Sequence, residues 1–270
     1  MNLAEHSKLI WSRIGVIVLS LVAVLAFEAH GQRYMGLNAP VMFVDDTESI
    51  TGGSMASPIG MVPYSAQAAT SHKTGFKLAG VAGYELQSGL RVEAELFLAR
   101  AGLDELIYSA PSAGGNPIPV GQIDVPVTGT ADHFGLLGNL MYDFDTGSDW
   151  IPFVGGGIGY MRIDQSDITY DQNALAQRIV DIQSQAAGQP SQPLPPGFVP
   201  EISDTANVFI WHLGAGIAYR VNDNLMLQSG YRFQAGDDLV FEGSNSFGTA
   251  HSESAMRIHF LEIGMRYRFQ

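Results

Sequence analysis

The sequence predicts an all-β fold: an eight-stranded antiparallel up-and-down transmembrane β-barrel with long extracellular loops. Three observations lead to this prediction. Apolar and polar residues alternate with a period of two in segments of roughly 9–12 residues, the length that a tilted membrane-spanning strand needs. Short and long connections between these segments alternate along the chain. The chain also contains 31 Gly, 14 Phe and 10 Tyr residues, which favour strands and turns over helices.

The strands follow one another as hairpins. A first strand is predicted at 34–44, although Pro40 in its middle removes a backbone hydrogen-bond donor. The clearest alternation lies in 90–100, where Leu90 and Val92 share one face and Arg91 and Glu93 the other. The facing of the glycine-rich segment 151–162 stays unassigned. The eight predicted strands are 34–44, 75–86, 90–100, 133–144, 150–162, 208–220, 225–233 and 259–269.

The connections decide the topology. Segments 87–89, 145–149 and 221–224 are turns of three to five residues, whereas the other four connections span about 25–45 residues. Outer-membrane barrels combine short periplasmic turns with longer extracellular loops in this way. A soluble β-sandwich or soluble barrel has no reason to separate its connections by length so completely.

The N-terminus has the features of a secretion signal. Lys8 and Arg13 come before an uncharged apolar run at 14–27, and the small residues Ala29 and Gly31 provide a cleavage site before Gln32. The run is shorter than the roughly 20 residues of a membrane-spanning helix. A short anchor or a buried helix is the alternative. We predict a signal peptide at 1–31 and, at 32–270, a β-barrel that is exported through the periplasm to the cell outer membrane.

The two faces of the strands are assigned from the membrane environment. Hydrocarbon requires every backbone polar group to be paired within the protein, so strands cross it only as a closed barrel with apolar residues outward. The alternative is a soluble sandwich with aromatic residues at the ends of its core. The predicted interior charge network is Arg91, Glu93, Glu95, Asp143, Arg220, Arg232, Glu262, Arg266 and Arg268. The predicted lipid-interface aromatics are Tyr84, Tyr142, Phe144, Tyr219, Tyr267 and Phe269 near the short turns, and Phe209, Trp211, Tyr231 and Phe233 near the long loops.

The charge is unevenly distributed. The net charge of −13 argues against nucleic-acid binding and against electrostatic docking on an anionic lipid surface. The absence of Cys excludes disulfides and thiolate chemistry.

The acidic residues are concentrated in the long connections. Segments 45–74, 101–132, 163–207 and 235–256 hold 17 acidic residues, whereas their basic residues are Lys73 and Arg178. The anionic loops are explained either by solubility and repulsion between cells or by recruitment of basic partners or bridging cations.

The candidates for chemistry are weak. His251, Ser252, Glu253 and Ser254 contain the residue types of a Ser–His–Glu hydrolase, but triad partners converge from separate elements, so a polar loop is favoured. The carboxylates of 45–48 do not match the spacing of a calcium loop. We therefore predict no enzyme, no cofactor and no metal site. An eight-stranded barrel is about wide enough for its own side chains, so the inward charges are expected to form a plug of ion pairs. An ion path through them is the alternative.

The connection at 163–207 has internal organisation. Leu175, Ile179 and Ile182 recur at helical spacing and predict a short amphipathic helix at 173–187. Five prolines between Pro190 and Pro200 then favour an extended arm. Two interpretations stay open for this segment, an adhesive tip and a mobile, antigenically variable loop.

Three segments resemble a known family. IPFVGGGIGYMRI at 151–163, WHLGAGIAYRVNDNLMLQSGYRF at 211–233 and HFLEIGMRYRF at 259–269 are similar to the last four strands of small outer-membrane β-barrels. The closest likeness is to the opacity-protein-like and major-surface-antigen type. The resemblance covers these strands well and the rest of the mature chain loosely.

The resemblance implies assembly by the outer-membrane insertion machinery through a C-terminal strand that ends in an aromatic residue. Tyr267 and Phe269 fit this signal, whereas Gln270 after the Phe departs from it. It also implies a surface-exposed protein with a structural, antigenic or adhesion role; the alternatives are a small-molecule or ion conduit and a lipid-modifying enzyme. The expected partners are outer-membrane lipids, the assembly machinery and a host-surface or cationic partner at the loops.

Overall fold

The computed structural model describes residues 31–57, 60–86, 88–118, 121–168, 172–186, 188–196, 198–199 and 205–269. The predicted signal peptide lies outside these residues apart from Gly31, as does Gln270. Among the described residues, none of the helices combines the length and the apolarity needed to cross a bilayer.

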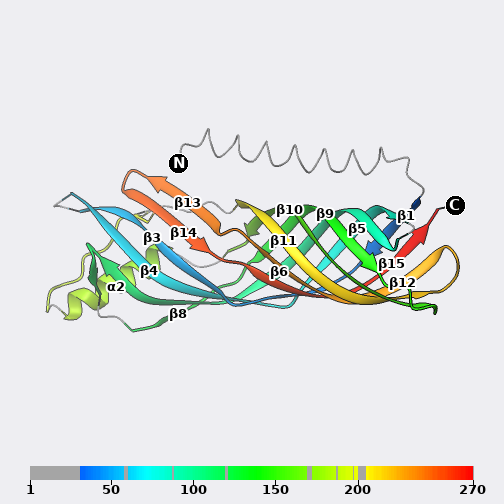
Figure 1. Cartoon of the computed structure of the whole chain (residues 1–270). Helices are drawn as coiled ribbons and strands as arrows, with labels where there is room; N and C mark the ends of the chain where they lie inside the picture. Colours follow the sequence, from blue (N-terminus) through cyan, green and yellow to red (C-terminus); the bar gives the residue numbers. More distant parts are fainter. Residues whose placement is uncertain are drawn as a thin grey trace.

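Eight strands close into a ring (Figure 1). Neighbours in the ring pair antiparallel, and the last strand pairs with the first, so that Tyr34 lies opposite Arg268. The predicted eight-stranded antiparallel fold is confirmed. In ring order the strands are β1 (Gly31–Asn38), β5 (Gly75–Leu86), β6 (Leu90–Ala113), β9 (Thr130–Asp143), β10 (Trp150–Ser166), β11 (Thr205–Arg220), β12 (Leu225–Gly236) and β15 (Arg257–Arg268).

The first predicted strand is broken at its proline. After β1 the chain resumes as β2 (Val41–Val44), which lies between β15 and β5. Pro40 has no N–H to donate, but its carbonyl oxygen accepts a hydrogen bond from the Lys77 amide at 2.9 Å. The wall of the barrel therefore continues past the proline in two pieces.

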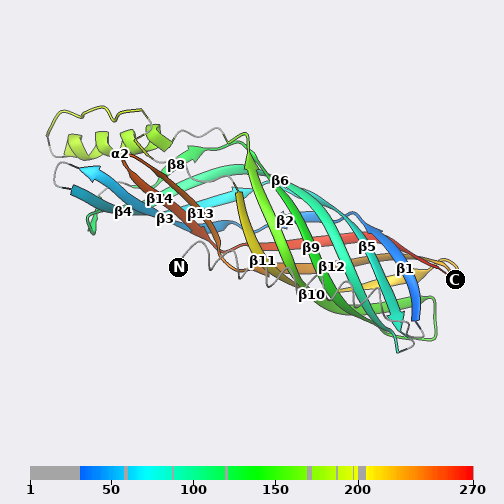
Figure 2. The ribbon, with the colours of Figure 1, turned by 90° about the horizontal axis from the view of Figure 1, so that it is seen from above.

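The long connections contain regular structure that the sequence pattern did not predict. On the side of the long connections, β6 continues beyond the ring, and further strands join it in the order β6–β4–β3–β14–β13 (Figures 1 and 2). These strands form a sheet that we call the extension. Its members besides β6 are β3 (Thr47–Ser57), β4 (Gly60–His72), β13 (Leu239–Asn245) and β14 (Gly248–Ser254), with the short β7 (Asn116–Pro117) and β8 (Ile123–Pro126) also paired to β6.

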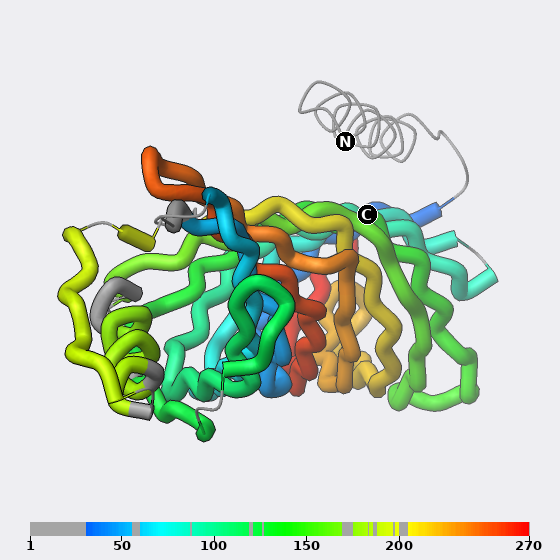
Figure 3. Tube along the Cα trace, turned by 90° about the vertical axis from the view of Figure 1, so that its left-hand side faces the viewer, coloured from blue at the N-terminus to red at the C-terminus, as the bar shows by residue number. Residues whose placement is uncertain are grey.

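The predicted helix is confirmed as α2 (Gln172–Ala186), but the proline-rich segment is not a free arm. It folds back on the helix, where Gln177 donates to the Gln192 carbonyl at 3.2 Å and accepts from the Leu194 amide at 2.6 Å. Figures 1 and 3 place α2 and the β13–β14 hairpin on opposite sides of the extension. The ring of Phe198 nevertheless lies 5.5 Å from that of Phe247 in the turn of the hairpin, so the segment after α2 contacts the hairpin.

Candidate functional site

The barrel interior holds two groups of buried charges at its periplasmic half. In the first, Asp143 accepts hydrogen bonds from Arg91 Nε and Arg266 Nη1, both at 3.0 Å. Arg91 also pairs with Glu93, whose Oε1 accepts the hydroxyl of Tyr34 at 2.5 Å. These side chains come from β1, β6, β9 and β15, so the group links four strands of the barrel across its interior.

The second group is centred on Glu95, which is completely buried. Its carboxylate lies 2.5 Å from Lys77 Nζ and accepts two hydrogen bonds from Arg232 Nη1, at 3.0 and 2.9 Å. The amide of Asn139 donates to the same carboxylate at 3.0 Å, and Arg232 Nε lies 2.8 Å from Glu262. Each buried charge in this group has a partner of opposite sign, which burial requires.

The glycine-rich strand β10 makes room for this second group. At Gly157 an added Cβ atom would lie 2.2 Å from Asn139 Oδ1 and 2.6 Å from His212 Nε2. These two atoms form a hydrogen bond of 2.8 Å. The facing that the sequence left open is therefore settled, with Ile151, Phe153 and the odd-numbered glycines of β10 on the inner face.

Seven of the nine predicted network residues lie in the two groups. Arg268 pairs with Glu85 at 2.7 Å at the periplasmic end. The assignment of Arg220 is wrong: its side chain is 38% exposed and lies 3.8 Å from Asp149, because it ends its strand at the turn. Four neutral or basic members of the groups were not predicted, although their positions in the alternation place them inward: Tyr34, Lys77, Asn139 and His212.

The charges that the structure places inside are balanced. The cationic and anionic side chains are equal in number, so the described interior carries no net charge to attract ions of either sign. They are Lys77, Arg91, Arg232, Arg266 and Arg268 against Glu85, Glu93, Glu95, Asp143 and Glu262.

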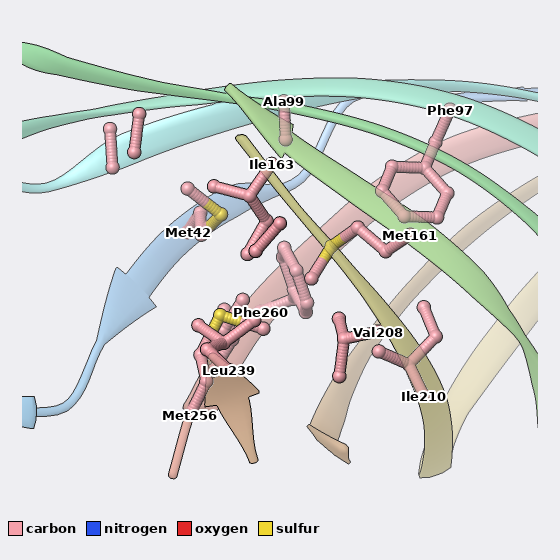
Figure 4. Packing of buried hydrophobic residues seen from close by; sticks show 14 of the residues in the cluster. Met42, Phe97, Ala99, Met161, Ile163, Val208, Ile210, Leu239, Met256 and Phe260 are labelled. Carbon is pink, nitrogen blue, oxygen red and sulfur yellow. The ribbon is translucent and has the colours of Figure 1, made fainter. Parts of the chain in front are cut away.

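The extracellular half of the interior is mainly apolar, with Gln234 and His133 buried among its side chains, so the expected plug of ion pairs fills only part of the barrel. Figure 4 shows Phe97, Met161, Ile210 and Phe260 in this packed cluster. Lys77 marks the junction, since its Nζ lies 4.3 Å from the ring centre of Phe97 and 4.9 Å from that of Phe260. Alternation did not predict this layer, because near the extracellular ends of the strands both the inward and the outward positions are occupied by apolar residues.

We predict negligible single-channel conductance for the purified monomer in planar bilayers. An ion would have to cross a packed apolar layer, where it loses its hydration, and then a neutral set of ion pairs. A large-pore outer-membrane porin in the same bilayers provides the positive control. Large, stable currents from the monomer would contradict the two-layer plug.

The predicted aromatic residues all lie on the outer surface of the barrel. Those near the turns include Tyr142 and Phe144, with ring centroids 4.9 Å apart, and Tyr267 and Phe269, 5.5 Å apart. Towards the extension, the rings of Trp211 and Phe233 lie 5.7 Å apart. The band between them exposes Leu213, Leu227, Leu140, Ile158, Leu261 and Ile263.

The outer end of the molecule holds the acidic surface and α2. Hydrogen bonds from Ser191 and Gln177 lower the pKa of Asp181 on the helix, which keeps its carboxylate charged. On β14, Ser252 lies on the face opposite to His251 and Glu253, since neighbouring side chains of a strand alternate. The structure therefore does not bring these candidate catalytic residues together.

Comparisons with known proteins agree with this architecture. The family described as the outer membrane protein β-barrel domain matches residues 14–269. Outer membrane protein P.IIC of Neisseria gonorrhoeae is 26% identical over 133 residues, which make up 48% of this chain and 44% of that protein, so the match spans less than half of the relative.

Solved structures of similar fold include the outer membrane protein OprG from Pseudomonas aeruginosa, with a TM-score of 0.51, 14% identity and coverage of 89% of this chain and 96% of that one. Neisserial surface protein A has a TM-score of 0.43 and 16% identity, with coverage of 88% and 97%. The likeness to OprG concerns the fold alone.

Proposed function

Because the chain belongs to the outer membrane protein β-barrel family and resides in the outer membrane, we propose that it is a surface-exposed protein with a structural, antigenic or adhesion role. The role is one of presentation: the barrel anchors the extension in the membrane and holds it outside the cell. No catalysis is part of this proposal.

The observation that carries the proposal is the combination of a filled barrel with a built extension. The interior is occupied by the apolar cluster and the paired charges. The extension, in contrast, continues the wall outward through β6 and adds four strands with α2. This arrangement favours contact at the outer end over passage through the middle.

The charge of the outer segments indicates the chemistry of the partner. Their 17 acidic residues against two basic ones make the outer segments strongly anionic. On the β13–β14 hairpin, Glu242 and Glu253 are exposed, and Asp237 and Asp238 come just before it. We therefore propose a basic partner, such as a cationic host-surface protein, as the occupant of this surface.

A deletion tests the proposal. Replacing residues 169–204 with a short Gly-Ser linker should leave insertion and heat-modifiability on a gel unchanged, because the strands of the ring are retained. Binding of intact cells to host cells should be lost, because α2 and the segment after it are removed. A second variant neutralises the hairpin with Asp237→Asn, Asp238→Asn, Glu242→Gln and Glu253→Gln, and should weaken only the salt-sensitive part of binding. If both variants bind as well as the wild type, the adhesive role lies elsewhere.

One observation favours a second function. The apolar cluster extends from Phe97 to Met256 and to Leu239 and Phe241 on β13 of the extension, which suits a small apolar molecule that enters from outside. We rank this conduit second, because the ion-pair groups below it would have to separate for passage. A lipid-modifying activity ranks third, since His251 and Ser252 lie on opposite faces of β14.

The C-terminal strand is the proposed contact with the assembly machinery. β15 closes the ring, and the Phe269 amide donates to the Arg33 carbonyl at 2.8 Å. The outward rings of Tyr267 and Phe269 lie together at its end. Outer-membrane lipids are the proposed partners of the exposed apolar band.

A further inference from the structure

Two arginines on the outer surface of the barrel form exposed pairs with aspartates. On β6, Arg100 donates to Asp132 from Nε at 2.5 Å and from Nη2 at 2.7 Å. On β10, Arg162 donates to Asp164 from Nε at 2.9 Å and from Nη2 at 2.8 Å. The two arginine side chains are 55% and 52% exposed.

Both arginines lie immediately beyond the outer end of the apolar band. The cross-strand neighbour of Arg100 on β5 is Phe76, and that of Arg162 on β9 is Phe134, both exposed on the outside. Going outward, apolar residues give way to charged ones at this level, and Lys73 pairs with Asp104 in the same region at 3.6 Å. In a membrane, this is the depth of the outer-leaflet headgroups.

Each guanidinium is held by one edge and leaves the other available. The carboxylate occupies Nε and Nη2 in both cases, whereas the planar group has five N–H donors. Among the described residues, neither Nη1 has a partner. The aspartates therefore orient the arginines before any ligand arrives, which reduces the entropy lost on binding.

We propose that Arg100 and Arg162 bind the phosphate groups of one anionic glycolipid of the outer leaflet. Only β9 lies between their strands, so the two backbones are about 10 Å apart. A headgroup with two phosphates spans this separation, and its acyl chains lie against Phe76 and Phe134. Arginine forks bind phosphate through paired, charge-assisted hydrogen bonds.

The acidity of the whole chain does not oppose this site. The net charge of −13 predicted no docking on an anionic surface, but most acidic residues lie in the outer segments. Their field is screened beyond about 8 Å in physiological salt, whereas the phosphate contacts are made at hydrogen-bond distance.

Binding of diphosphoryl lipid A to the full-length protein in zwitterionic detergent tests the proposal, with native mass spectrometry as the readout. The Arg100→Gln/Arg162→Gln variant should bind about tenfold more weakly or worse, since it loses two charge-assisted contacts. Arg257→Gln is the matched control, because Arg257 is also exposed at the outer end but lies on β15, on another side of the ring. Its affinity should stay within about twofold of the wild type.

A second variant separates ligand contact from structural pairing. Asp132→Asn/Asp164→Asn breaks the same pairs but keeps both guanidinium groups, so it should still bind the lipid. Equal loss in this variant, or in Arg257→Gln, would overturn the proposal. So would unchanged binding by the arginine variant, equal binding of dephosphorylated lipid A, or displacement of the lipid by equimolar inorganic phosphate. Loss caused by EDTA but not by the arginine substitutions would instead place the phosphate on carboxylate-bound cations.

Discussion

Replacing Glu95 with alanine will destabilise the barrel by about 3–5 kcal/mol, the usual effect of removing one partner of a buried ion pair. Glu95 is completely buried and is the shared partner of Lys77 and Arg232. Without it, Nζ of Lys77 lies against the rings of Phe97 and Phe260 with no carboxylate at contact distance among its described partners. Urea unfolding in lipid vesicles, followed by tryptophan fluorescence, measures the change.

Two further variants make the test of Glu95 specific. Asp149→Ala removes the partner of Arg220 in an exposed pair and should change the free energy of unfolding by less than about 1 kcal/mol. Adding Lys77→Met to Glu95→Ala removes the unpaired cation and should recover part of the lost stability. If Glu95→Ala costs no more than Asp149→Ala, the buried charges do not stabilise the barrel as described.

Replacing Ile263 with arginine will destabilise the membrane-inserted barrel by about 2–4 kcal/mol, the cost of a cation on the lipid-facing side near the bilayer midplane. Ile263 is 65% exposed in the middle of β15. In water such a substitution would be nearly neutral. Unfolding in lipid vesicles and the amount of protein assembled in outer membranes both report the effect.

Ile50→Arg is the matched control for Ile263→Arg. Ile50 is 61% exposed on β3 of the extension, where we expect water rather than lipid, so its replacement should change stability by less than about 0.5 kcal/mol. Equal tolerance of the two substitutions would mean that the apolar band does not face lipid.

The sequence was sufficient for the ring of strands. Alternation in 90–100 and the three short turns located the hairpins, because a strand with one apolar face has only one acceptable register. The helix at Gln172–Ala186 was also predicted from the spacing of Leu175, Ile179 and Ile182. In these regions the local pattern and the final environment agree.

The extension could not be predicted by the same reasoning. Its strands β3 and β14 consist largely of Gly, Ser, Thr and Ala, which give no apolar alternation. Their pairing joins residues such as Met55 and Gly248, which are nearly two hundred positions apart in the chain. Only the folded barrel brings these segments together, so no local sequence pattern predicts their pairing.

The interior was predicted in part. The charged positions of β6, β12 and β15 indicated inward charges, but neutral members such as Asn139 and His212 carry no charge to reveal them. The facing of β10 was ambiguous because an inward glycine such as Gly157 has no side chain to indicate a face. Gly157 leaves the volume that the side chains of Asn139 and His212 occupy. The apolar half of the interior could not be distinguished from the charged half in this way. Phe97 and Leu137 occupy inward positions equivalent to those of Glu95 and Asn139, and alternation indicates only that a position faces inward.

The uninterrupted length of β6 determines how the protein would withstand a mechanical load. This strand runs for 24 residues, from the periplasmic turn through the wall into the extension. When the outer end of the protein is bound to a surface and flowing liquid drags on the cell, the force acts along β6. It is then at right angles to the antiparallel hydrogen bonds that join β6 to β5, β9 and β4. Such shear loads many bonds at once, so the adhesive contact should detach before the anchor is drawn out of the membrane.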